Sequence, residues 1–298
     1  MIKTAIVILN YNGLSDTLEC LESLRKLEKQ QMDVEIIIVD NGSQDGSQET
    51  LSKIKDIEFI RNEENLGFAG GNNKGIKLAL ERNADFVLII NNDTLLDAKA
   101  LTKLLDAANS AQLVSPKIYF AKGFEFHKDW YKKEQLGKVI WYAGAKIDWQ
   151  NIIGQHIGVN EVDRGQFSER CEIDFTTGAC MLVKRTVFEK IGFFDEKYFL
   201  YLEDMDFCVR AKKAKYKIIF EPQAIIWHKN ASSAEGSGSK LQDYFITRNR
   251  LFFAIKYASL KTKFAVIRQI IGQLKNPIKR KAFLDFLTLN FGKGSYLP

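Results

Sequence analysis

Four strand-like runs in the first third of the chain are each followed by side chains that can bind a ligand. The strings that follow them are Asn10-Tyr11-Asn12-Gly13, Asp40-Asn41-Gly42-Ser43, Asn65-Leu66-Gly67-Phe68-Ala69-Gly70-Gly71-Asn72 and Asn91-Asn92-Asp93-Thr94. Amides and carboxylates bind nucleotide hydroxyls and hard divalent cations, and glycines let the backbone approach a ligand closely. Each string alone also fits an ordinary turn, and Asp93 alone also fits the start of a helix. Their repetition after successive strands favours one shared binding site.

An acidic cluster in the last third of the chain, Glu203-Asp204-Met205-Asp206, opens a predicted amphipathic helix. A carboxylate there can serve as a general base. Acids in a first helical turn also favour the helix dipole, and Asp206 and Arg210 have the spacing of an i,i+4 ion pair. Side chains two residues apart on a helix point ~200° apart, so residues 204 and 206 cannot both face one reaction centre. We therefore expect Asp206 to pair with Arg210 and Asp204 to face a cleft.

Strand-like and helix-like patterns alternate through the first 120 residues and would position these strings. Predicted strands cover 5–9, 34–39, 57–60, 86–90 and 113–115, and predicted helices cover 14–27, 76–82 and 98–108. Apolar strands that alternate with helices form a largely parallel sheet covered on both faces. Ligands bind such sheets at the carboxyl ends of the strands, which is where the polar strings fall.

The composition is that of a globular protein. The 298 residues are 46% hydrophobic and 27% charged, which excludes disorder and collagen-like repetition. The first strand is not followed by Gly-x-Gly-x-x-Gly, and no Walker loop occurs, which argues against dinucleotide oxidoreductases and P-loop enzymes. The four cysteines form no Cys-x-x-Cys pair, so we expect neither a zinc ribbon nor a disulfide framework. We therefore expect the protein to be located in a reducing cytoplasm. No signal peptide and no membrane-spanning run is predicted.

Positive charge is concentrated in the C-terminal tail. Residues 240–298 hold 12 basic and 2 acidic side chains, whereas the rest of the chain holds 31 and 35. An apolar stripe flanked by basic residues follows spacings of four and three: Phe253, Tyr257, Leu260, Phe264, Ile267, Ile271 and Leu274. Such a basic amphipathic helix is typical of binding to an anionic membrane surface, with packing on the body or homodimer formation as alternatives. Pro277 fits the first position of a second helix. Duplex binding needs no such stripe, so no nucleic acid partner is expected.

Eight strings follow one another in order over about residues 1–230: VILNYNG (7–13), VDNGSQDGS (39–47), NLGFAGGNNKGI (65–76), NNDT (91–94), TTGACMLVKR (176–185), GFFDE (192–196), YLEDMDFCVRAKKAKYKIIFEP (201–222) and WH (227–228). Together they resemble glycosyltransferase family 2, in its rhamnosyltransferase-like branch. The resemblance implies an A-type glycosyltransferase fold, an α/β fold with a mostly parallel Rossmann-like sheet flanked by helices. It implies a nucleotide-sugar-dependent catalytic domain, which we place over residues 1–235, and the basic amphipathic pattern predicts a helical tail over residues 236–298.

The resemblance also implies inverting transfer of a sugar from a nucleoside diphosphate to a hydroxyl, assisted by Mg²⁺ or Mn²⁺. It assigns the metal to Asp93 and to His228, which closes the run AIIWH. The chain has Asn91-Asn92-Asp93 where the family usually has Asp-x-Asp, so one carboxylate of that motif is missing. The general base is assigned to Asp204. The acceptor side is assigned to Glu203, Thr177 and Gly178.

Donor binding is expected from the polar strings. The residues assigned to it are Asn10, Tyr11, Asp40, Asn65, Gly67, Gly71, Asn91 and Asn92. The leading donor is dTDP-L-rhamnose, and a UDP-hexose donor or a non-catalytic nucleotide-sugar-binding protein are the alternatives. The expected acceptor is a glycan or polyprenol-linked glycan of cell-surface or cell-wall polysaccharide synthesis. We expect a cytoplasmic protein attached peripherally to the inner face of the plasma membrane. The aromatic-rich residues 120–170 are given no role.

Overall fold

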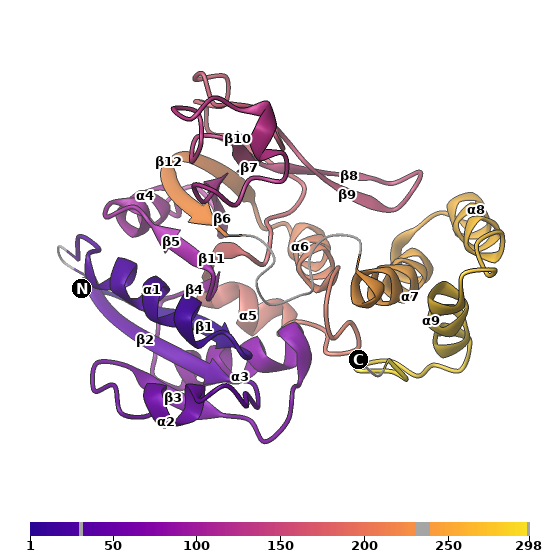
Figure 1. The fold of residues 1–298 in the computed structure, drawn as a ribbon, viewed down its shortest axis with the longest axis horizontal. Helices are drawn as coiled ribbons and strands as arrows, with labels where there is room; N and C mark the ends of the chain where they lie inside the picture. The colour runs from indigo at the N-terminus through magenta and orange to yellow at the C-terminus, as the bar shows by residue number, and fades with distance from the viewer. Residues whose placement is uncertain (30–31, 230–238, 297–298) are drawn as a thin grey trace.

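A mixed ten-stranded sheet forms the centre of the protein in a computed structural model that describes residues 1–29, 32–229 and 239–296 (Figure 1). Its strands follow the order β10-β12-β6-β11-β4-β1-β2-β3, with β5 paired to β12 and β7 paired to β6. The strands of this sheet are β1 (Ile2–Asn10), β2 (Met32–Asp40), β3 (Glu58–Arg61), β4 (Phe86–Asn91), β5 (Thr94–Leu96), β6 (Leu113–Phe120), β7 (Ile140–Tyr142), β10 (Cys171–Glu172), β11 (Cys180–Lys184) and β12 (Ile218–His228). A separate hairpin joins β8 (Ala145–Asp148) to β9 (Ile153–His156).

The strands β3, β2, β1 and β4 are parallel and bring the polar strings to one edge. Asn10 at the end of β1 lies opposite Asp40 at the end of β2, and Asp40 lies opposite Arg61 of β3. On the other side of β1, Leu9 lies opposite Asn91 of β4. Because these strands point the same way and end in register, the strings that follow them meet. β6 and β12 also pair in parallel, so the expected mostly parallel sheet is confirmed for its long strands. Among them, β11 is the exception, because it runs antiparallel between β4 and β6.

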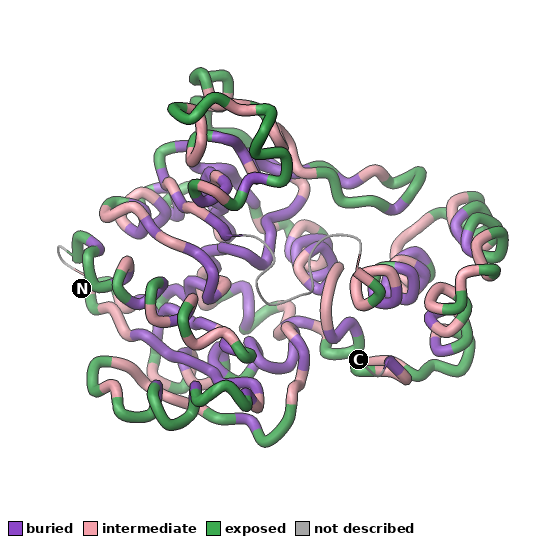
Figure 2. Tube along the Cα trace, viewed as in Figure 1, coloured by how far each residue is buried: buried purple, intermediate pink, exposed green. Residues whose placement is uncertain are grey.

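Helices and loops cover both faces of this sheet. The helices are α1 (Leu14–Arg25), α2 (Ser47–Leu51), α3 (Gly67–Glu81), α4 (Ala100–Ala107), α5 (Arg185–Ile191), α6 (Glu203–Lys213), α7 (Lys240–Tyr257), α8 (Leu260–Ile271) and α9 (Pro277–Leu287), with one 3₁₀ turn at Lys128–Trp130. Residues 5–8 of β1 and 37–39 of β2 are fully buried (Figure 2). Consecutive strand residues point to opposite faces, so their unbroken burial shows that neither face is open to solvent.

The glycine-rich string forms the first turns of α3, where the sequence predicted a helix only over 76–82. Asn65 Oδ1 accepts a 2.8 Å hydrogen bond from the N–H of Gly67, where α3 begins. Further along, a Cβ at Gly71 would lie 2.3 Å from Leu9 Cδ1, and a Cβ at Gly75 would lie 2.5 Å from a methyl carbon of β1. These glycines let α3 lie close to the sheet. Hydrophobic periodicity misses such a start because glycine has no side chain to bury.

The apolar stripe predicted over 253–274 is divided between α7 and α8. The backbone is extended at Ala258 and Ser259, and Ser259 Oγ accepts a hydrogen bond from the N–H of Thr262 to start α8. Phe253 is fully buried in the same hydrophobic core as the sheet. Packing on the body, one of the alternatives for the tail, is therefore confirmed for α7.

The three helices of the tail lie together beside the sheet, beyond α6 (Figure 1). Pro277 is the first residue of α9, as the sequence predicts. On α8, Leu260 and Phe264 are 73% and 71% exposed. The predicted domain boundary at 235/236 lies outside the described residues. Within the described part of the chain, no helix combines the length and apolar character needed to span a membrane.

Candidate active site

A cavity of about 510 Å³ opens where the polar strings meet. Residues from the ends of β1, β4 and β12, from the starts of α3 and α6, and from the turn before β11 line it. Among them are eleven that the sequence singled out: Tyr11, Asn65, Gly67, Asn91, Asn92, Asp93, Thr177, Gly178, Glu203, Asp204 and His228. The tertiary structure thus gathers the residues assigned to the metal, the base and the acceptor side in one place.

Asn10 and Asp40 do not line the cavity and instead form a buried network next to it. Asn10 Nδ2 donates to Asp40 Oδ1 at 2.8 Å, while Asn10 Oδ1 accepts from Thr17 Oγ1 at 2.8 Å. Thr17 Oγ1 also accepts from Nδ2 of Asn92, which lines the cavity, at 3.0 Å. The network therefore fixes the position of Asn92. Gly71, the third predicted donor residue that does not line the cavity, packs on β1 instead.

Asp93 and His228 meet at the cavity wall. Asp93 Oδ1 lies 3.0 Å from His228 Nε2, and both side chains are almost fully buried. They are held together by the sheet, since Thr94 of β5 pairs with His228 of β12, and the N–H of Lys229 donates to the Asp93 carbonyl at 2.9 Å. Burial opposes ionisation of Asp93, but the neighbouring His228 and Lys229 outweigh it and hold the pKa of Asp93 below its ordinary value.

The Asp93 and His228 pair fits a divalent cation. Among the described residues, His228 Nδ1 has no hydrogen-bond partner and Asp93 Oδ1 has none besides its contact with His228 Nε2, although buried polar atoms of folded proteins are normally paired. In the described ranges, no third His, Cys, Asp or Glu completes a metal-binding cluster with them. Mg²⁺ and Mn²⁺ commonly keep water and phosphate oxygens among their ligands, so two protein ligands suffice when a phosphate supplies others. The residues thus suit a cation shared with a phosphate-bearing ligand.

Asp204 faces the same cavity from the first turn of α6. Its Oδ2 accepts a 2.9 Å hydrogen bond from the N–H of Gly178, in the turn before β11. The surrounding protein raises the pKa of Asp204 by desolvation, and the hydrogen bonds from Gly178 and Met205 work against this rise. A carboxylate with a raised pKa is a stronger base, which suits proton abstraction from a bound hydroxyl.

Glu203 lies beside Asp204 and is also buried at the cavity wall. Burial and the charge of Asp204 raise the pKa of Glu203 well above its ordinary value. Its Oε2 atom has no hydrogen-bond partner in the part of the chain that the structure describes. Burial also raises the pKa of the nearby Tyr201 hydroxyl to about 12. Burial thus favours the protonated forms of Glu203 and Tyr201, and both side chains line the same cavity as Asp204.

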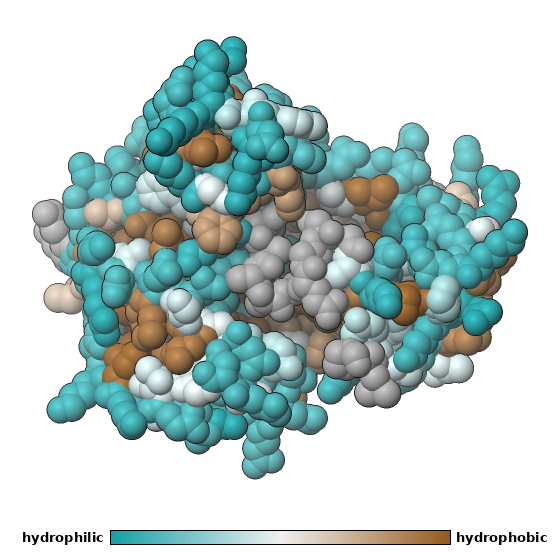
Figure 3. All heavy atoms as spheres, in the orientation of Figure 1, coloured by the Kyte–Doolittle hydropathy of each residue, from teal (hydrophilic) through white to brown (hydrophobic). Residues whose placement is uncertain are grey.

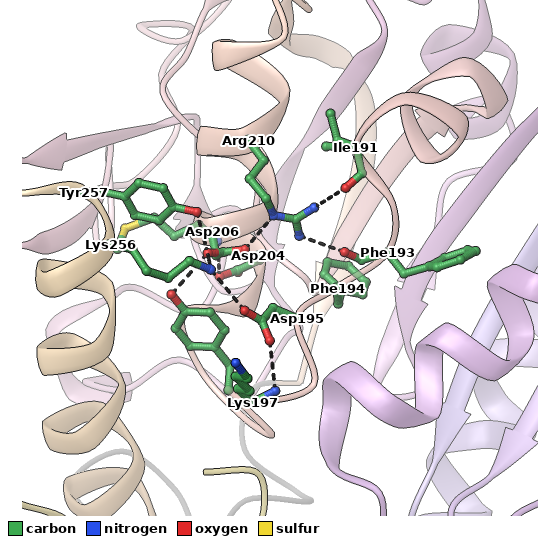
Figure 4. Close-up of polar contacts among 12 residues, drawn as sticks. Ile191, Phe193, Phe194, Asp195, Lys197, Asp204, Asp206, Arg210, Lys256 and Tyr257 are labelled. Atoms are coloured by element: carbon green, nitrogen blue, oxygen red, sulfur yellow. Dashed lines mark hydrogen bonds and ion pairs between the residues drawn. The ribbon is translucent and has the colours of Figure 1, made fainter. Parts of the chain in front are cut away.

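Asp206 belongs to a separate cluster, as helix geometry predicts. Its Oδ2 accepts from Arg210 Nε at 2.8 Å, and its Oδ1 accepts from Lys256 and from the Tyr257 hydroxyl of α7. Figure 4 shows these side chains of α6 and α7 converging on Asp206. Arg210 also donates to the carbonyls of Ile191, the last residue of α5, and of Phe193. The expected pairing of Asp206 with Arg210 is confirmed.

Aromatic residues from the segment 120–170 complete the cavity, although no role was predicted for them. Trp141 of β7 meets the His228 ring edge-on, with centroids 4.6 Å apart, and meets His156 of β9 at 4.9 Å. Burial, aided by the charge of His228, lowers the pKa of His156 to about 4, so this imidazole is neutral at physiological pH. Phe126 lines the cavity as well. The aromatic richness of the segment was the available signal, but nothing in the spacing pointed to the cavity.

Residues 5–192 match the family model described as Glycosyl transferase family 2. A hexosyltransferase of low-salt glycan biosynthesis from Haloferax volcanii, Agl10, is 26% identical over 72% of this chain, which spans 63% of that relative. An N-acetylglucosaminyl-diphospho-decaprenol L-rhamnosyltransferase from Mycobacterium tuberculosis is 27% identical over 67% of this chain and 68% of its own length. The crystal structure of GalNAc-T7 with UDP, GalNAc and Mn²⁺ is similar in fold, with a TM-score of 0.60 at 14% identity over 90% of this chain and 54% of that one.

Proposed function

Because this chain belongs to glycosyl transferase family 2, whose members transfer sugars, we propose that it moves L-rhamnose from dTDP-L-rhamnose onto a glycan or polyprenol-linked glycan with inversion. The rhamnosyltransferase relative from Mycobacterium tuberculosis supports this donor and a lipid-linked acceptor. The observation that carries the proposal is that Asp93 and Asp204, from separate parts of the fold, line one cavity. One can serve the leaving diphosphate and the other the incoming hydroxyl.

In this proposal, Asp204 is the general base. The acceptor oxygen forms a bond to the anomeric carbon as the bond from that carbon to the diphosphate oxygen breaks. The hydroxyl proton passes to the Asp204 carboxylate, and the electron pair of the broken bond leaves with the nucleoside diphosphate. Glu203, which burial favours in its neutral form, donates a hydrogen bond to the acceptor sugar. Thr177 and Gly178 line the acceptor side beneath it.

Asp93 and His228 hold a Mg²⁺ or Mn²⁺ ion in this proposal. Bound there, the cation supplies Lewis-acid stabilisation of the charge on the leaving diphosphate. The presence of Mn²⁺ in the GalNAc-T7 structure supports a divalent ion, without deciding between the two metals. Tyr11, Asn65, Gly67, Asn91 and Asn92 contact the donor directly. Asn10 and Asp40 act through the network that fixes Asn92.

A UDP-hexose is the second candidate donor. The Haloferax relative is a hexosyltransferase, and GalNAc-T7 was crystallised with UDP. A non-catalytic nucleotide-sugar-binding protein is the third candidate, suggested by Asn91, which stands where the Asp-x-Asp motif has its first carboxylate. Against it stands Asp204, which faces the cavity with a raised pKa as a base requires.

We propose that α8 and α9 attach the protein to an anionic membrane surface on its cytoplasmic side. Leu260, Phe264 and Ile271 of α8 lie one turn or two apart on one helix face and are all exposed. Lys261, Lys263 and Arg268 flank that row, and no described carboxylate lies within ion-pair distance of them. Hydrophilic side chains cover most of the visible face of the tail helices α7, α8 and α9 (Figure 3). An apolar row with basic side chains beside it matches an anionic lipid surface. It matches a second copy of the tail less well, because two basic tails would repel each other.

A donor panel tests the proposed function. The purified protein is incubated with Mn²⁺ and dTDP-L-rhamnose, UDP-glucose or UDP-N-acetylglucosamine, and both thermal stabilisation and nucleoside diphosphate release are measured. A donor present at about 100 times its dissociation constant adds ~2.7 kcal/mol to the stability. Stabilisation and slow dTDP release with dTDP-L-rhamnose support the leading donor. The same result with a UDP-sugar alone supports the second candidate, and stabilisation without release by any donor supports the binding protein.

A further inference from the structure

Helix α7 of the tail contacts both flanks of the segment that carries Glu203 and Asp204. Near its middle, Arg248 and Asn249 bind backbone carbonyls of residues 197–201. At its end, Lys256 binds Asp195 and Asp206, as Figure 4 shows. The segment is thus held just before and just after the two acids. No role was predicted from the sequence for Arg248 or Asn249, and Lys256 was expected only to flank the apolar stripe.

The held segment has an unfavourable backbone conformation. Phe199, Tyr201 and Leu202 have φ angles of 65°, 68° and 70°, in the left-handed region. This region is disfavoured for residues with a Cβ, and such residues persist only where surrounding contacts fix them. Three of them directly before α6 set the direction in which that helix begins. They therefore also set the direction in which Glu203 and Asp204 point.

A single amide contacts three backbone carbonyls next to the left-handed residues. Asn249 Nδ2 lies 2.9 Å from the carbonyl oxygen of Tyr198, 2.8 Å from that of Leu200 and 2.9 Å from that of Tyr201. The Asn249 side chain is fully buried. Its orientation is fixed because Asn249 Oδ1 accepts a 3.0 Å hydrogen bond from Arg248 Nε. The amide hydrogens can then point only toward the carbonyls.

Arg248 also donates hydrogen bonds to backbone carbonyls, in this case from a charged guanidinium. It is fully buried and donates to the carbonyls of Tyr198 at 3.0 Å, Lys197 at 3.2 Å and Gly292 at 2.7 Å. No carboxylate of residues 1–29, 32–229 or 239–296 forms an ion pair with it. Phe245 packs against its guanidinium, 5.0 Å from the ring centroid. Tyr244 and the charge of Asp285 offset part of the cost of burying this guanidinium, and its other N–H groups donate to backbone carbonyls next to the left-handed residues and at Gly292.

We propose that Asn249 and Arg248 are positioning residues that hold the left-handed segment 199–202 and so aim Asp204 into the cavity. The inference rests on the proposed function, in which Asp204 is the base. It also makes α7 part of the catalytic machinery, because the residues that aim the base come from the tail. Their removal should slow turnover without weakening donor binding, since neither residue lines the cavity.

The test compares Asn249→Asp and Asn249→Ala with the wild-type protein. Turnover is followed as dTDP release from dTDP-L-rhamnose with Mn²⁺, or as UDP release from UDP-glucose if that donor alone is active. Binding is followed by calorimetric titration with dTDP or UDP. We expect kcat to fall roughly 10- to 100-fold, because a misplacement of ~1 Å in a reacting group costs about that much, while the dissociation constant stays near wild type. Amide hydrogen exchange over residues 198–202 should become faster in both variants.

Asn276→Ala is the matched control. Asn276 caps α9 through hydrogen bonds to the N–H groups of Ile278 and Lys279, so its loss destabilises the tail without touching the segment. This variant should keep wild-type kcat. The proposal is overturned if Asn249→Asp keeps wild-type kcat, or if Asn276→Ala loses as much. Should both Asn249 variants fail to fold, wild-type exchange decides, because rapid exchange over residues 198–202 contradicts a held segment. Full turnover in Asp204→Asn would instead refute the proposed base. The hydrogen-exchange data would still test whether Asn249 and Arg248 hold residues 199–202.

Discussion

Asp93, between β4 and β5, and Asp204, at the start of α6, line one cavity, and one turn of the chain hydrogen-bonds to Asp204 and to β4. Within that turn, the N–H of Gly178 donates to Asp204 Oδ2 at 2.9 Å, and the carbonyl of Ala179 accepts from the N–H of Asn91 at 3.0 Å. The turn before β11 thus bonds to the proposed base, Asp204, on one side and to β4, which precedes the proposed metal ligand Asp93, on the other. Backbone groups of this turn therefore help to fix Asp204 relative to the end of β4.

Asp204→Asn should reduce sugar transfer by about 100- to 10,000-fold, since the amide cannot accept the acceptor proton. The amide oxygen can still accept the hydrogen bond from Gly178, so dTDP binding should stay near wild type. Turnover is measured as nucleoside diphosphate release and binding by calorimetry. Near-normal turnover in this variant would show that Asp204 is not the base.

Asp93→Ala should weaken the binding of dTDP or UDP in the presence of Mn²⁺ by roughly 10-fold or more, because the cation loses its carboxylate ligand. Binding measured in the presence of EDTA should be the same in the variant and the wild type. Calorimetric titrations with and without metal make the comparison. Equal affinities in Mn²⁺ would remove Asp93 from the metal site.

Asp206→Asn should lower the free energy of unfolding near neutral pH by about 2–4 kcal/mol, because Arg210 and Lys256 lose a buried counter-ion. Burial opposes ionisation of Asp206, but Arg210 and Lys256 outweigh it and hold its pKa below the ordinary value of 3.8. The unfolded chain therefore binds this proton more readily than the folded one. The stabilisation is complete above the pKa of the unfolded state and is lost as the pH falls through the lower folded pKa.

Urea unfolding of the wild type and of Asp206→Asn is measured at about pH 7 and about pH 3. The difference between their free energies of unfolding should become smaller at the lower pH. Asp56→Asn is the control, since Asp56 forms an exposed ion pair with Arg25 that should contribute ~0–1 kcal/mol. A gap between wild type and Asp206→Asn that stays constant with pH would contradict the assigned charge state of Asp206.

The triple change of Lys261, Lys263 and Arg268 to Glu should abolish co-flotation with vesicles that contain phosphatidylglycerol. Each basic residue near an anionic surface contributes ~1 kcal/mol, so reversing three of them changes attraction to repulsion. Phe264→Ser should weaken flotation by removing an exposed apolar contact. High salt should weaken it in the wild type as well.

A matched control reverses three exposed lysines of the body, Lys26, Lys53 and Lys55, which gives the same net charge. This control should float like the wild type, since its changes lie far from α8 in the sequence and on other elements. Equal loss of flotation in both triple variants would indicate a response to net charge alone. Absence of wild-type flotation would refute membrane attachment through the tail.

Local patterns explain which parts of the site were predictable. The strings after β1, β2 and β4 could be placed together because parallel strands end at one edge, and Asp206 could be assigned to Arg210 because helical spacing is fixed. The start of α3 could not be placed by periodicity, since its glycines pack by close backbone approach. The break of the tail stripe at Ser259 depended on one side-chain cap within an otherwise regular pattern.

The sequence by itself determined the alternation of strands and helices, the residue types at the strand ends and the acidic start of α6, since these depend on neighbours within a few residues. Tertiary structure alone decided that Trp141 and His156 close the cavity and that Asn249 holds the backbone before Glu203. Those contacts join segments far apart in the chain through irregular loops. Their geometry follows from packing in three dimensions, and no periodic pattern in the sequence encodes it.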